Sequence, residues 1–472
     1  MPDLIPKDFH EFVEKSFNKK ELAKQLGITR QRLHLWKSTG VPFEKIKEVS
    51  TFTNIGEGEL LKETYSRRYG QNKNSNISVD VLSKNEFEKE NFQNIIYFDN
   101  NSTTKTDDRV IDVMLPYFSD LYANPASKHS AGQVVKEATQ KARLQVASLL
   151  NCSQNEIYFT SGATEAINTA IKGIAFNFLN KGKHIITAKT EHSAVLDVCK
   201  YLEKLGYEIT YLDVNKDGLI DIDEYKNSLR YDTILVCTMH VNNETGVIQP
   251  IQEFANIAKE NGTIFMTDAT QSVGKLPISL KNSDIDILTF SGHKFHGPKG
   301  IGTLYIKKKF PESIRIMPLL HGGGQENGFR SGTLNTPSIV GLGYACELAQ
   351  KEMQFNKNYI ADLRDNIEEV LLKMPGAFLN GSLNKRIHNV LNIGFKGVDS
   401  DALLAGLENI ALSKGSACSA NSINPSHVLT AMGLSEKDAF SSIRISLSKY
   451  NNQEEIEFAL KKITNLINSI RD

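Results

Sequence analysis

Short β-type runs alternate with segments of helical periodicity along most of this chain, and this alternation constrains the fold most. Parallel strands need a crossover connection, so strands separated by helices predict an α/β domain with a mostly parallel, doubly wound sheet. The runs are IYF at 96–98, EIYFT at 156–160, HIITAK at 184–189, EITYLDV at 208–214, TILVCTMH at 233–240, TIFMTDA at 263–269, DILTFS at 286–291 and GTLYI at 302–306.

The chain of 472 residues is too long for one compact core and is expected to form several domains. Residues 1–70 are predicted to form short helices, and the polar stretch 71–94 is predicted to be a linker. Residues 95–350 form the predicted α/β domain. A smaller α+β domain is expected over 351–472, with a loop rich in Gly, Ser and Asn at 413–425.

Charge, cysteine spacing and the length of apolar runs argue against several kinds of partner and site. Lys plus Arg and Asp plus Glu both total 55, so net charge gives no argument for a nucleic-acid or membrane partner. The five cysteines lack CxxC spacing, which argues against a disulfide framework and against a resident metal site. No secretory signal and no apolar run of membrane-spanning length is evident, so a soluble, cytoplasmic protein without a membrane partner is expected.

Polar residues follow several β-type runs directly. Asp268 ends one run, Lys294 follows another, and a Ser-Gly-Ala-Thr turn at 161–164 leads from a third run into a helical pattern. Each alone is more often a helix cap, a surface charge or a plain turn. Together they match one cofactor, because lysine forms imines, a carboxylate keeps a pyridinium protonated, and helix-opening N–H groups bind phosphate. They predict a site for pyridoxal 5'-phosphate (PLP) at the carboxyl ends of the strands.

A long series of motifs then points to one family. The motifs are YFDNNSTT, NPAS, FTSGATEA, TEHSAVL, MHVNNETGV, DATQSVGKLP, FSGHKFHGPKGIG, HGGGQE, RSGT, GSACSA and SSIRIS. With them, the chain from about Ile95 to its C-terminus resembles the cysteine desulfurases, which are fold-type I PLP enzymes. The resemblance implies an aspartate aminotransferase-like large domain over 95–350, with 95–106 packing on the small C-terminal domain.

The resemblance also implies roles around the PLP ring. Lys294 would link covalently to the cofactor, Asp268 would pair with the pyridine nitrogen, and Gln271 would contact the ring hydroxyl. His192 would stack on the ring and act as an acid/base group. The alternative for His192 is an ordinary buried imidazole.

Further roles concern the phosphate and the substrate. Asn243 would contact the cofactor and, with Arg444, bind the carboxylate of L-cysteine; a guanidinium can do so through its bidentate fork, although Arg444 could instead form an ion pair. Thr333 would reach the phosphate of a neighbouring subunit, which implies a homodimer. The residues expected around the phosphate within one chain are Ala163, Thr164, Ser291 and His293.

Cys418 is the candidate nucleophile. It lies in KGSACSANSINPS, a small and polar segment expected to form a mobile loop, whereas the other cysteines lie in apolar, helical or turn contexts. GSACSA resembles the active-site motif of the family, which implies that Cys418 takes sulfur from L-cysteine as a persulfide and leaves L-alanine. The long loop resembles the type that delivers sulfur to an acceptor protein for iron–sulfur cluster assembly or tRNA or DNA thiolation, with Cys418 a possible transient ligand of a [2Fe-2S] cluster.

Some positions depart from the family or suggest another function. Ser102, Asn327 and Lys414 stand where the family often has Ala, a basic residue and Ser. The segment from Asp213 to Glu224 satisfies the spacing of a calcium-binding EF-hand loop. An EF-hand needs a helix before its loop, whereas EITYLD is a β-type run, so calcium binding is not expected here.

The N-terminal segment KELAKQLGITRQRLHLWKSTG has two amphipathic helical patterns around a turn that contains Gly27. It resembles the helix-turn-helix of Cro-like regulators. A face of the second helix would carry the candidate DNA-binding residues Arg30, Gln31, His34 and Lys37. The alternative is a helical domain that docks on protein.

Two rival functions stay open. One is another fold-type I PLP enzyme, such as a selenocysteine lyase or an aminotransferase; the placement of Cys418 argues against it. The other is a transcription regulator whose PLP domain senses a ligand, which the presence of both Lys294 and Cys418 disfavours.

Overall fold

The computed structural model describes residues 49, 94–308, 314–415 and 424–471. The chain divides into two units, Met1–Ile95 and Ile96–Asp472. The helix-turn-helix prediction, with Arg30, Gln31, His34 and Lys37, lies outside the described residues.

A seven-stranded sheet forms the centre of the second unit, in the order β2-β8-β7-β6-β5-β3-β4. Strands β3 to β7 pair in parallel, whereas β8 runs antiparallel to both β7 and β2. The predicted α/β fold with a mostly parallel sheet is therefore confirmed. The strands are β2 (Ile157–Thr160), β3 (His184–Ala188), β4 (Glu208–Leu212), β5 (Thr233–Cys237), β6 (Ile264–Asp268), β7 (Ile287–Ser291) and β8 (Gly302–Ile306).

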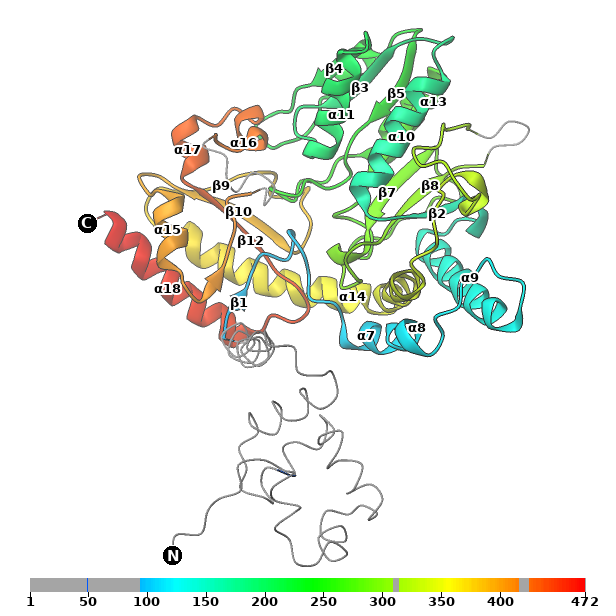
Figure 1. Cartoon of the computed structure of the whole chain (residues 1–472). Helices are drawn as coiled ribbons and strands as arrows, with labels where there is room; N and C mark the ends of the chain where they lie inside the picture. The colour runs from blue at the N-terminus through cyan, green and yellow to red at the C-terminus, as the bar shows by residue number, and fades with distance from the viewer. Residues whose placement is uncertain (1–48, 50–93, 309–313, 416–423, 472) are drawn as a thin grey trace, which may run out of the picture. The chain divides into compact units, whose positions relative to one another are not determined.

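Helices cover both faces of the sheet (Figure 1). Neighbouring strand residues point to opposite faces, so Val236 and Phe265 join one hydrophobic core while Leu235 and Met266 join the other. This is why the strands read as nearly continuous apolar runs. The helices of this part are α7 (Asp108–Met114), α8 (Pro116–Ser119), α9 (Ser130–Leu150), α10 (Ala163–Asn177), α11 (Ser193–Glu203), α12 (Ile222–Ser228) and α13 (Ile251–Glu260).

The C-terminal part contains a three-stranded antiparallel sheet in the order β12-β10-β9 and a separate parallel pair, β1 with β11. Through β1, the start of this unit is tied to its C-terminal part. These strands are β1 (Ile96–Tyr97), β9 (Ala377–Leu379), β10 (Val390–Phe395), β11 (Ile410–Ala411) and β12 (Ser442–Ser446).

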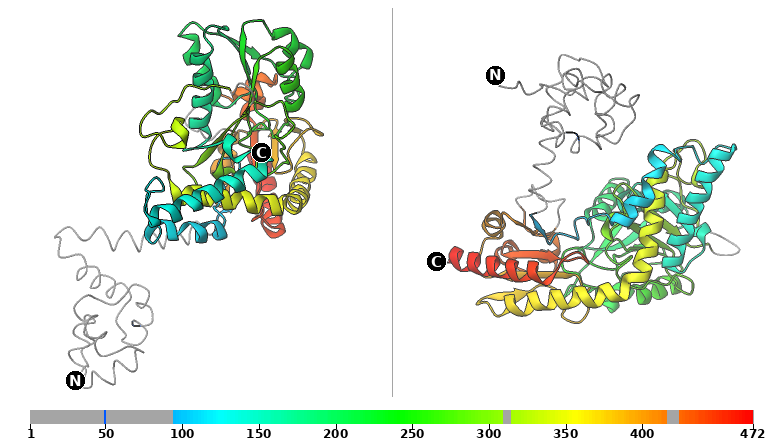
Figure 2. Two further views of the ribbon diagram at one scale, coloured as in Figure 1. Left: turned by 90° about the vertical axis from the view of Figure 1, so that its right-hand side faces the viewer. Right: turned by 90° about the horizontal axis from the view of Figure 1, so that it is seen from below.

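One long helix, α14 (Thr336–Leu372), runs unbroken through residue 350 and contacts α9 and α18 (Gln453–Arg471). Figure 2 shows α14 and α18 lying side by side. Gly343 permits the close crossing of α14 and α9, because a Cβ there would lie 2.5 Å from the Ala142 Cα. The remaining helices are α15 (Ser400–Gly406), α16 (His427–Ala431) and α17 (Glu436–Phe440).

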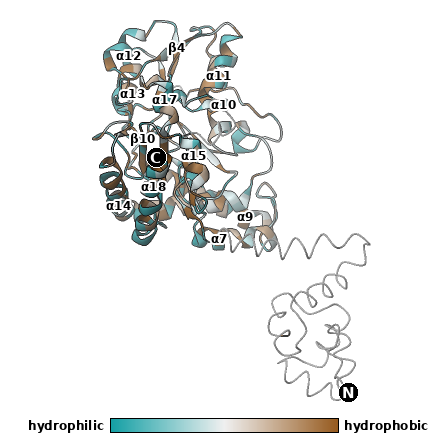
Figure 3. Cartoon of the chain, turned by 90° about the vertical axis from the view of Figure 1, so that its left-hand side faces the viewer, coloured by the Kyte–Doolittle hydropathy of each residue, from teal (hydrophilic) through white to brown (hydrophobic). Residues whose placement is uncertain are grey.

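The amphipathic character of α18 explains its position. Ile456, Ala459, Ile463 and Ile467 recur at helical spacing and are buried against the C-terminal sheet. The opposite face of the helix is hydrophilic (Figure 3). None of the helices within the described ranges is long and apolar enough to span a membrane.

The segment with EF-hand spacing has the flanking structure that the sequence predicts. Strand β4 precedes it, and Asp221 accepts hydrogen bonds from the backbone N–H groups of Asp223 and Glu224 at 2.9 Å, which caps α12. Asn215 closes the turn through its side-chain oxygen, which accepts from the N–H groups of Asp217 and Leu219. These side chains therefore organise a strand-to-helix turn.

Candidate active site

A cavity of about 480 Å³ opens at the carboxyl ends of β6 and β7 and at the start of α10. We call it the active-site cavity. Ten residues predicted from the sequence line it, although they come from positions up to 281 residues apart. They are Ala163, Thr164, His192, Asn243, Asp268, Gln271, Ser291, His293, Lys294 and Arg444.

The first turn of α10 forms one wall. Gly162 precedes the helix, and no side chain caps its N-terminus. A helix N-terminus without a cap presents N–H groups and a positive dipole end to an anion. Ser291 lies at the end of β7, and the Gly302 Cα packs so closely on Gly162 that a Cβ would lie 2.5 Å from the Gly162 carbonyl carbon. The wall suits a phosphate group.

Asp268 ends β6 and is buried. Its Oδ1 accepts hydrogen bonds from the backbone N–H of Thr270 at 2.9 Å and from the Thr270 hydroxyl. Among the described residues no hydrogen bond reaches Oδ2, so this oxygen is available to a donor in the active-site cavity. A carboxylate held in this way suits a protonated ring nitrogen.

Lys294 follows β7 in a short 3-10 helix, Gly292–Lys294. Its Nζ donates to the backbone carbonyl oxygens of Asn101 and Ser102, each at 2.8 Å. Both acceptors belong to the YFDNNSTT motif and follow β1, and the sequence gives no indication of their contact with Lys294. This segment therefore holds the amine at the cavity wall.

His192 precedes α11, and its Nδ1 accepts a hydrogen bond from the Ala194 N–H at 3.1 Å. Burial lowers its pKa, the carboxylate of Asp268 opposes this shift, and the ammonium of Lys294 adds to it. A neutral imidazole with Nδ1 as acceptor carries its proton on Nε2. Such a ring can stack on a cofactor and exchange a proton.

Arg444 on β12 is only 1% exposed. Its guanidinium donates to Asp99 Oδ1 at 2.6 Å, to the Ser102 hydroxyl at 2.8 Å and to the Asn243 carbonyl at 2.9 Å. The Nε atom is buried and has no hydrogen-bond partner. The cation thus lines the cavity with its Nε donor unused, and Ser102 is one of its partners.

Two predicted residues lie elsewhere. Thr333 is exposed in the segment before α14 and does not line the active-site cavity of its own chain. Cys418 lies outside the described residues. The chain before it is described as far as Gly415, and Ser413 pairs with Arg444 in a β-bridge, so the segment that carries Cys418 starts beside the cavity wall.

The four described cysteines are poor nucleophiles. Cys199, Cys237 and Cys346 are buried and Cys152 is partly buried. Burial raises the pKa of each thiol, to about 12 for Cys152 and Cys199, because an apolar environment disfavours the thiolate. This leaves Cys418 as the cysteine whose sequence context suits nucleophilic chemistry.

The comparisons with known proteins agree with this geometry. The aminotransferase class-V family model matches residues 96–458. Cysteine desulfurase IscS of Mannheimia succiniciproducens is 46% identical over 380 residues, which are 80% of this chain and 94% of the relative. The chain belongs to the cysteine desulfurase family. Among solved structures, a NifS-like protein is similar to this desulfurase with 39% identity and a TM-score of 0.75, over 79% of this chain and all of the other.

The structure of SspA in complex with cysteine matches the desulfurase with 39% identity and a TM-score of 0.67, over 76% of this chain and all of SspA. Enzymes of this family depend on PLP. The residues of the active-site cavity fit that cofactor, because an uncapped helix N-terminus, the free oxygen of Asp268 and the amine of Lys294 provide for a phosphate, a ring nitrogen and a carbonyl carbon.

Some residues of the site were missed by sequence reasoning. Thr103 also lines the cavity, and its hydroxyl lies 3.1 Å from His293 Nδ1. Lys299 and Gly300 lie at the rim in the loop before β8. These residues belong to the YFDNNSTT and GPKGIG motifs, and this membership is the sequence signal that could have identified them as site residues.

Proposed function

We propose that the desulfurase converts L-cysteine into L-alanine and leaves the sulfur on Cys418 as a persulfide. The Cβ–S bond of the substrate breaks and an S–S bond to Cys418 forms, so that L-cysteine and a thiol give L-alanine and a persulfide. The observation that carries this proposal is the meeting of Lys294, Asp268, His192 and Arg444 in one cavity beside the segment that leads to Cys418.

When bound, PLP supplies an electron sink for the substrate carbons. Lys294 Nζ would hold the cofactor and remove the α-proton, because the Asn101 and Ser102 carbonyls hold this amine at the cavity wall. Asp268 would hold the ring nitrogen and keep it protonated, with Oδ2 available for this contact. Asn243 and Arg444 orient the substrate carboxylate, and His192 exchanges protons near the leaving sulfur. The Cys418 thiolate then attacks that sulfur.

The direct test is turnover of L-cysteine by the purified holoenzyme. Wild type is expected to release alanine, and sulfide in the presence of a reductant. Cys418→Ala should lose this activity while keeping the visible absorbance of the bound cofactor. Full activity in Cys418→Ala would refute the role of Cys418, and turnover of selenocysteine alone would indicate a lyase instead.

We propose that the sulfur passes to an acceptor protein in iron–sulfur cluster assembly, as the similarity to cysteine desulfurases IscS supports.

We further propose a homodimer in which Thr333 serves the partner's phosphate site. Its exposure at the surface, away from its own active-site cavity, supports this placement. Mixed dimers that pair a Thr333→Val chain with a Lys294→Ala chain test this placement. The site of the Lys294→Ala chain would carry both changes, whereas the site of the Thr333→Val chain would carry neither. Such dimers should therefore keep about half of the activity.

We propose that residues 1–70 bind DNA through Arg30, Gln31, His34 and Lys37. The helical patterns around Gly27 support this proposal. A gel-shift assay of the full chain, repeated over a range of salt concentrations, should show binding that weakens as salt rises. Alanine at Arg30 and Lys37 should weaken it, and no shift at low salt would favour a protein-docking module.

A further inference from the structure

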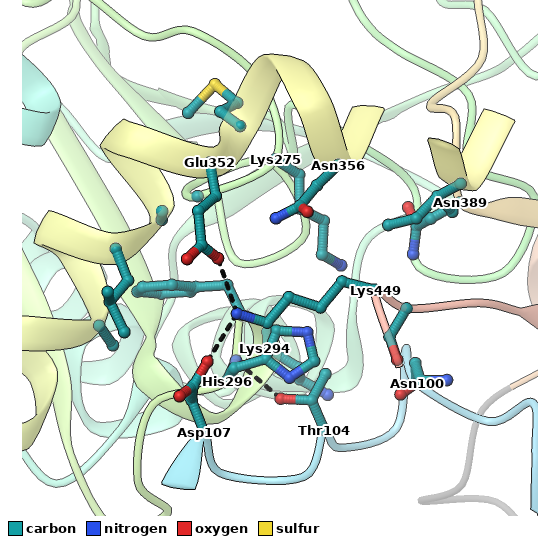
Figure 4. Close-up of a pocket in the computed structure, with 18 of the residues that line it drawn as sticks. Asn100, Thr104, Asp107, Lys275, Lys294, His296, Glu352, Asn356, Asn389 and Lys449 are labelled. Atoms are coloured by element: carbon teal, nitrogen blue, oxygen red, sulfur yellow. Dashed lines mark hydrogen bonds and ion pairs between the residues drawn. The ribbon is translucent and has the colours of Figure 1, made fainter. Parts of the chain in front are cut away.

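A second, smaller cavity of about 50 Å³ lies against the active-site cavity, and Lys294 lines both. We call it the inner cavity. Figure 4 shows Lys275 and Asn389 on one side of it and the group Asp107, Lys449 and Glu352 on another. Lys275 belongs to the DATQSVGKLP motif but has no role in the proposed reaction.

The side chain of Lys275 is joined to the active-site cavity by one hydrogen bond. Its Nζ donates to the Gln271 side-chain oxygen at 2.9 Å, and the Gln271 amide nitrogen donates to the Asn101 carbonyl at 3.0 Å. The same carbonyl accepts from Lys294 Nζ at 2.8 Å. A short chain of hydrogen bonds therefore connects the two lysine amines.

These contacts fix the orientation of the Gln271 amide. An ammonium can only donate, so the amide oxygen must face Lys275 and the NH₂ group must face the active-site cavity. One hydrogen of that NH₂ group goes to Asn101, and the other is free for an acceptor such as a ring oxygen. Without Lys275, the Asn101 carbonyl would be the remaining group among these contacts that holds the amide in this orientation.

The charge of Lys275 is poorly compensated. In the part of the chain that the structure describes, no carboxylate forms an ion pair with it. Desolvation by burial, with the positive charges of Lys294 and Arg444, lowers the pKa of Lys275 to about 7. The nearby Lys449 is itself paired with Asp107 at 2.6 Å and Glu352 at 2.9 Å, and Arg109 pairs with the same two carboxylates, so these four charges balance.

The inner cavity provides the solvation that such an amine needs. Asn389 Oδ1 and His388 Nδ1 are buried and have no hydrogen-bond partner, and both residues line this cavity. A cavity of this volume holds a few water molecules, at about 15 Å³ each, and buried waters bind where polar atoms lack partners. Water there would bridge these atoms to Lys275 and let it exchange protons.

We propose that Lys275 is a positioning residue for the PLP reaction: it holds the Gln271 amide with its donor toward the active-site cavity and places a positive charge next to Gln271. This inference rests on the cofactor position given under the proposed function. Its consequence concerns the protonation of the linkage between Lys294 and PLP. A cation nearby disfavours protonation of that linkage, and so does a donor to the adjacent ring oxygen.

The groups that face Lys275 are the cations Lys294 and Arg444 and the group Asp107, Lys449 and Glu352, whose charges balance once Arg109 is included. The imidazoles nearby are His293, His296 and His388. Burial lowers the pKa of these imidazoles, to about 4 for His293 and His296 and about 3 for His388, so they stay neutral near neutral pH. Replacing Lys275 with a neutral residue therefore removes one positive charge and leaves no carboxylate of the described residues unpaired.

The test is a pH titration of the visible absorbance of the bound cofactor in the holoenzyme, without substrate. In Lys275→Met the pH midpoint is expected to rise by about 0.5 to 1 unit, because the positive charge that Lys275 carries below its pKa of about 7 is lost at short range. Lys275→Arg keeps the charge and should stay near the wild-type midpoint. Lys200→Met, an exposed lysine on α11, is the matched control and should not move it.

An unchanged midpoint in Lys275→Met, or equal shifts in Lys275→Met and Lys275→Arg, would overturn the proposal. If Lys275→Met fails to retain cofactor, Lys275→Gln is titrated in its place, with the same expected rise. The cofactor position is checked separately with Lys294→Ala. If that variant keeps the wild-type absorbance, the proposed function fails rather than the role of Lys275.

Discussion

At the scale of single residues, the site depends on neighbours that decide charge and orientation. Arg444 would bind the substrate carboxylate, yet its guanidinium already donates to Asp99, Ser102 and the Asn243 carbonyl. These partners hold the guanidinium in one position and compensate for its burial, which is almost complete. A buried charge without them would be costly.

Ser102→Ala tests this arrangement. The hydroxyl accepts a hydrogen bond from Arg444 and thereby competes with a substrate carboxylate for the same donor. Its loss should lower the KM for L-cysteine by roughly two- to fivefold, because a substrate carboxylate would gain about 0.5 to 1 kcal/mol from the released donor, with kcat almost unchanged. Steady-state kinetics check this, and an unchanged KM would show that the serine does not compete.

Sequence reasoning found the residues of the site that follow strands. Asp268 and Lys294 are predictable because the carboxyl ends of neighbouring parallel strands meet at one edge of the sheet. The contacts of Lys294 with Asn101 and Ser102 are not predictable in this way, since they join residues 193 and 192 positions apart. The orienting contact of Lys275 was also missed, because a lysine after a turn reads as a solvated charge.

At the scale of elements, the position of β8 determines the shape of the phosphate wall. The β-type run GTLYI predicts a strand, but its antiparallel direction depends on the short connection from β7, which allows no crossover helix. The length of α14 likewise could not be predicted from the apolar pattern of the sequence. Its 37 residues cover two cores in turn, so no single apolar periodicity persists along it.

Gly302→Ala tests the packing of β8 on the start of α10. A Cβ at this position would lie 2.5 Å from the Gly162 carbonyl carbon and 2.8 Å from the Phe290 carbonyl oxygen, and backbone atoms cannot easily move away. We expect a loss of about 2 kcal/mol in the free energy of unfolding and weaker PLP binding, because the first turn of α10 must shift.

Urea unfolding and PLP titration of the apoenzyme measure the two effects of Gly302→Ala. Lys308→Ala, at an exposed position just after the same strand, serves as the control. Wild-type PLP affinity in Gly302→Ala would mean that the phosphate wall does not depend on this close approach.

At the scale of the whole described unit, an ion-pair group connects parts that are distant in sequence. Asp107 accepts hydrogen bonds from Arg109 at 2.7 Å and from Lys449 at 2.6 Å, and Glu352 on α14 pairs with both cations. The Arg109 guanidinium and the Lys449 ammonium hold the pKa of Asp107 well below its usual range. A lowered carboxyl pKa contributes stability above the unfolded value of about 3.9, and this contribution is lost as the pH falls.

Asp107→Asn is therefore expected to be less stable than wild type by about 2 kcal/mol at pH 7, with the difference shrinking below about pH 4. Asparagine can still cap α7, so the change reports mainly on the charge. Urea unfolding at several pH values measures the difference. A gap of the same size at pH 7 and at low pH would contradict the sign of this pKa shift.

The most direct measurement for the enzyme as a whole is mass spectrometry of the holoenzyme after incubation with L-cysteine, followed by peptide mapping. We predict that the peptide containing Cys418 gains the mass of one sulfur atom, that the gain is lost on reduction, and that Lys294→Ala shows none. Sulfur on Cys152, Cys199, Cys237 or Cys346 with Cys418 unmodified would contradict the proposed reaction, as would an unmodified protein that still releases alanine.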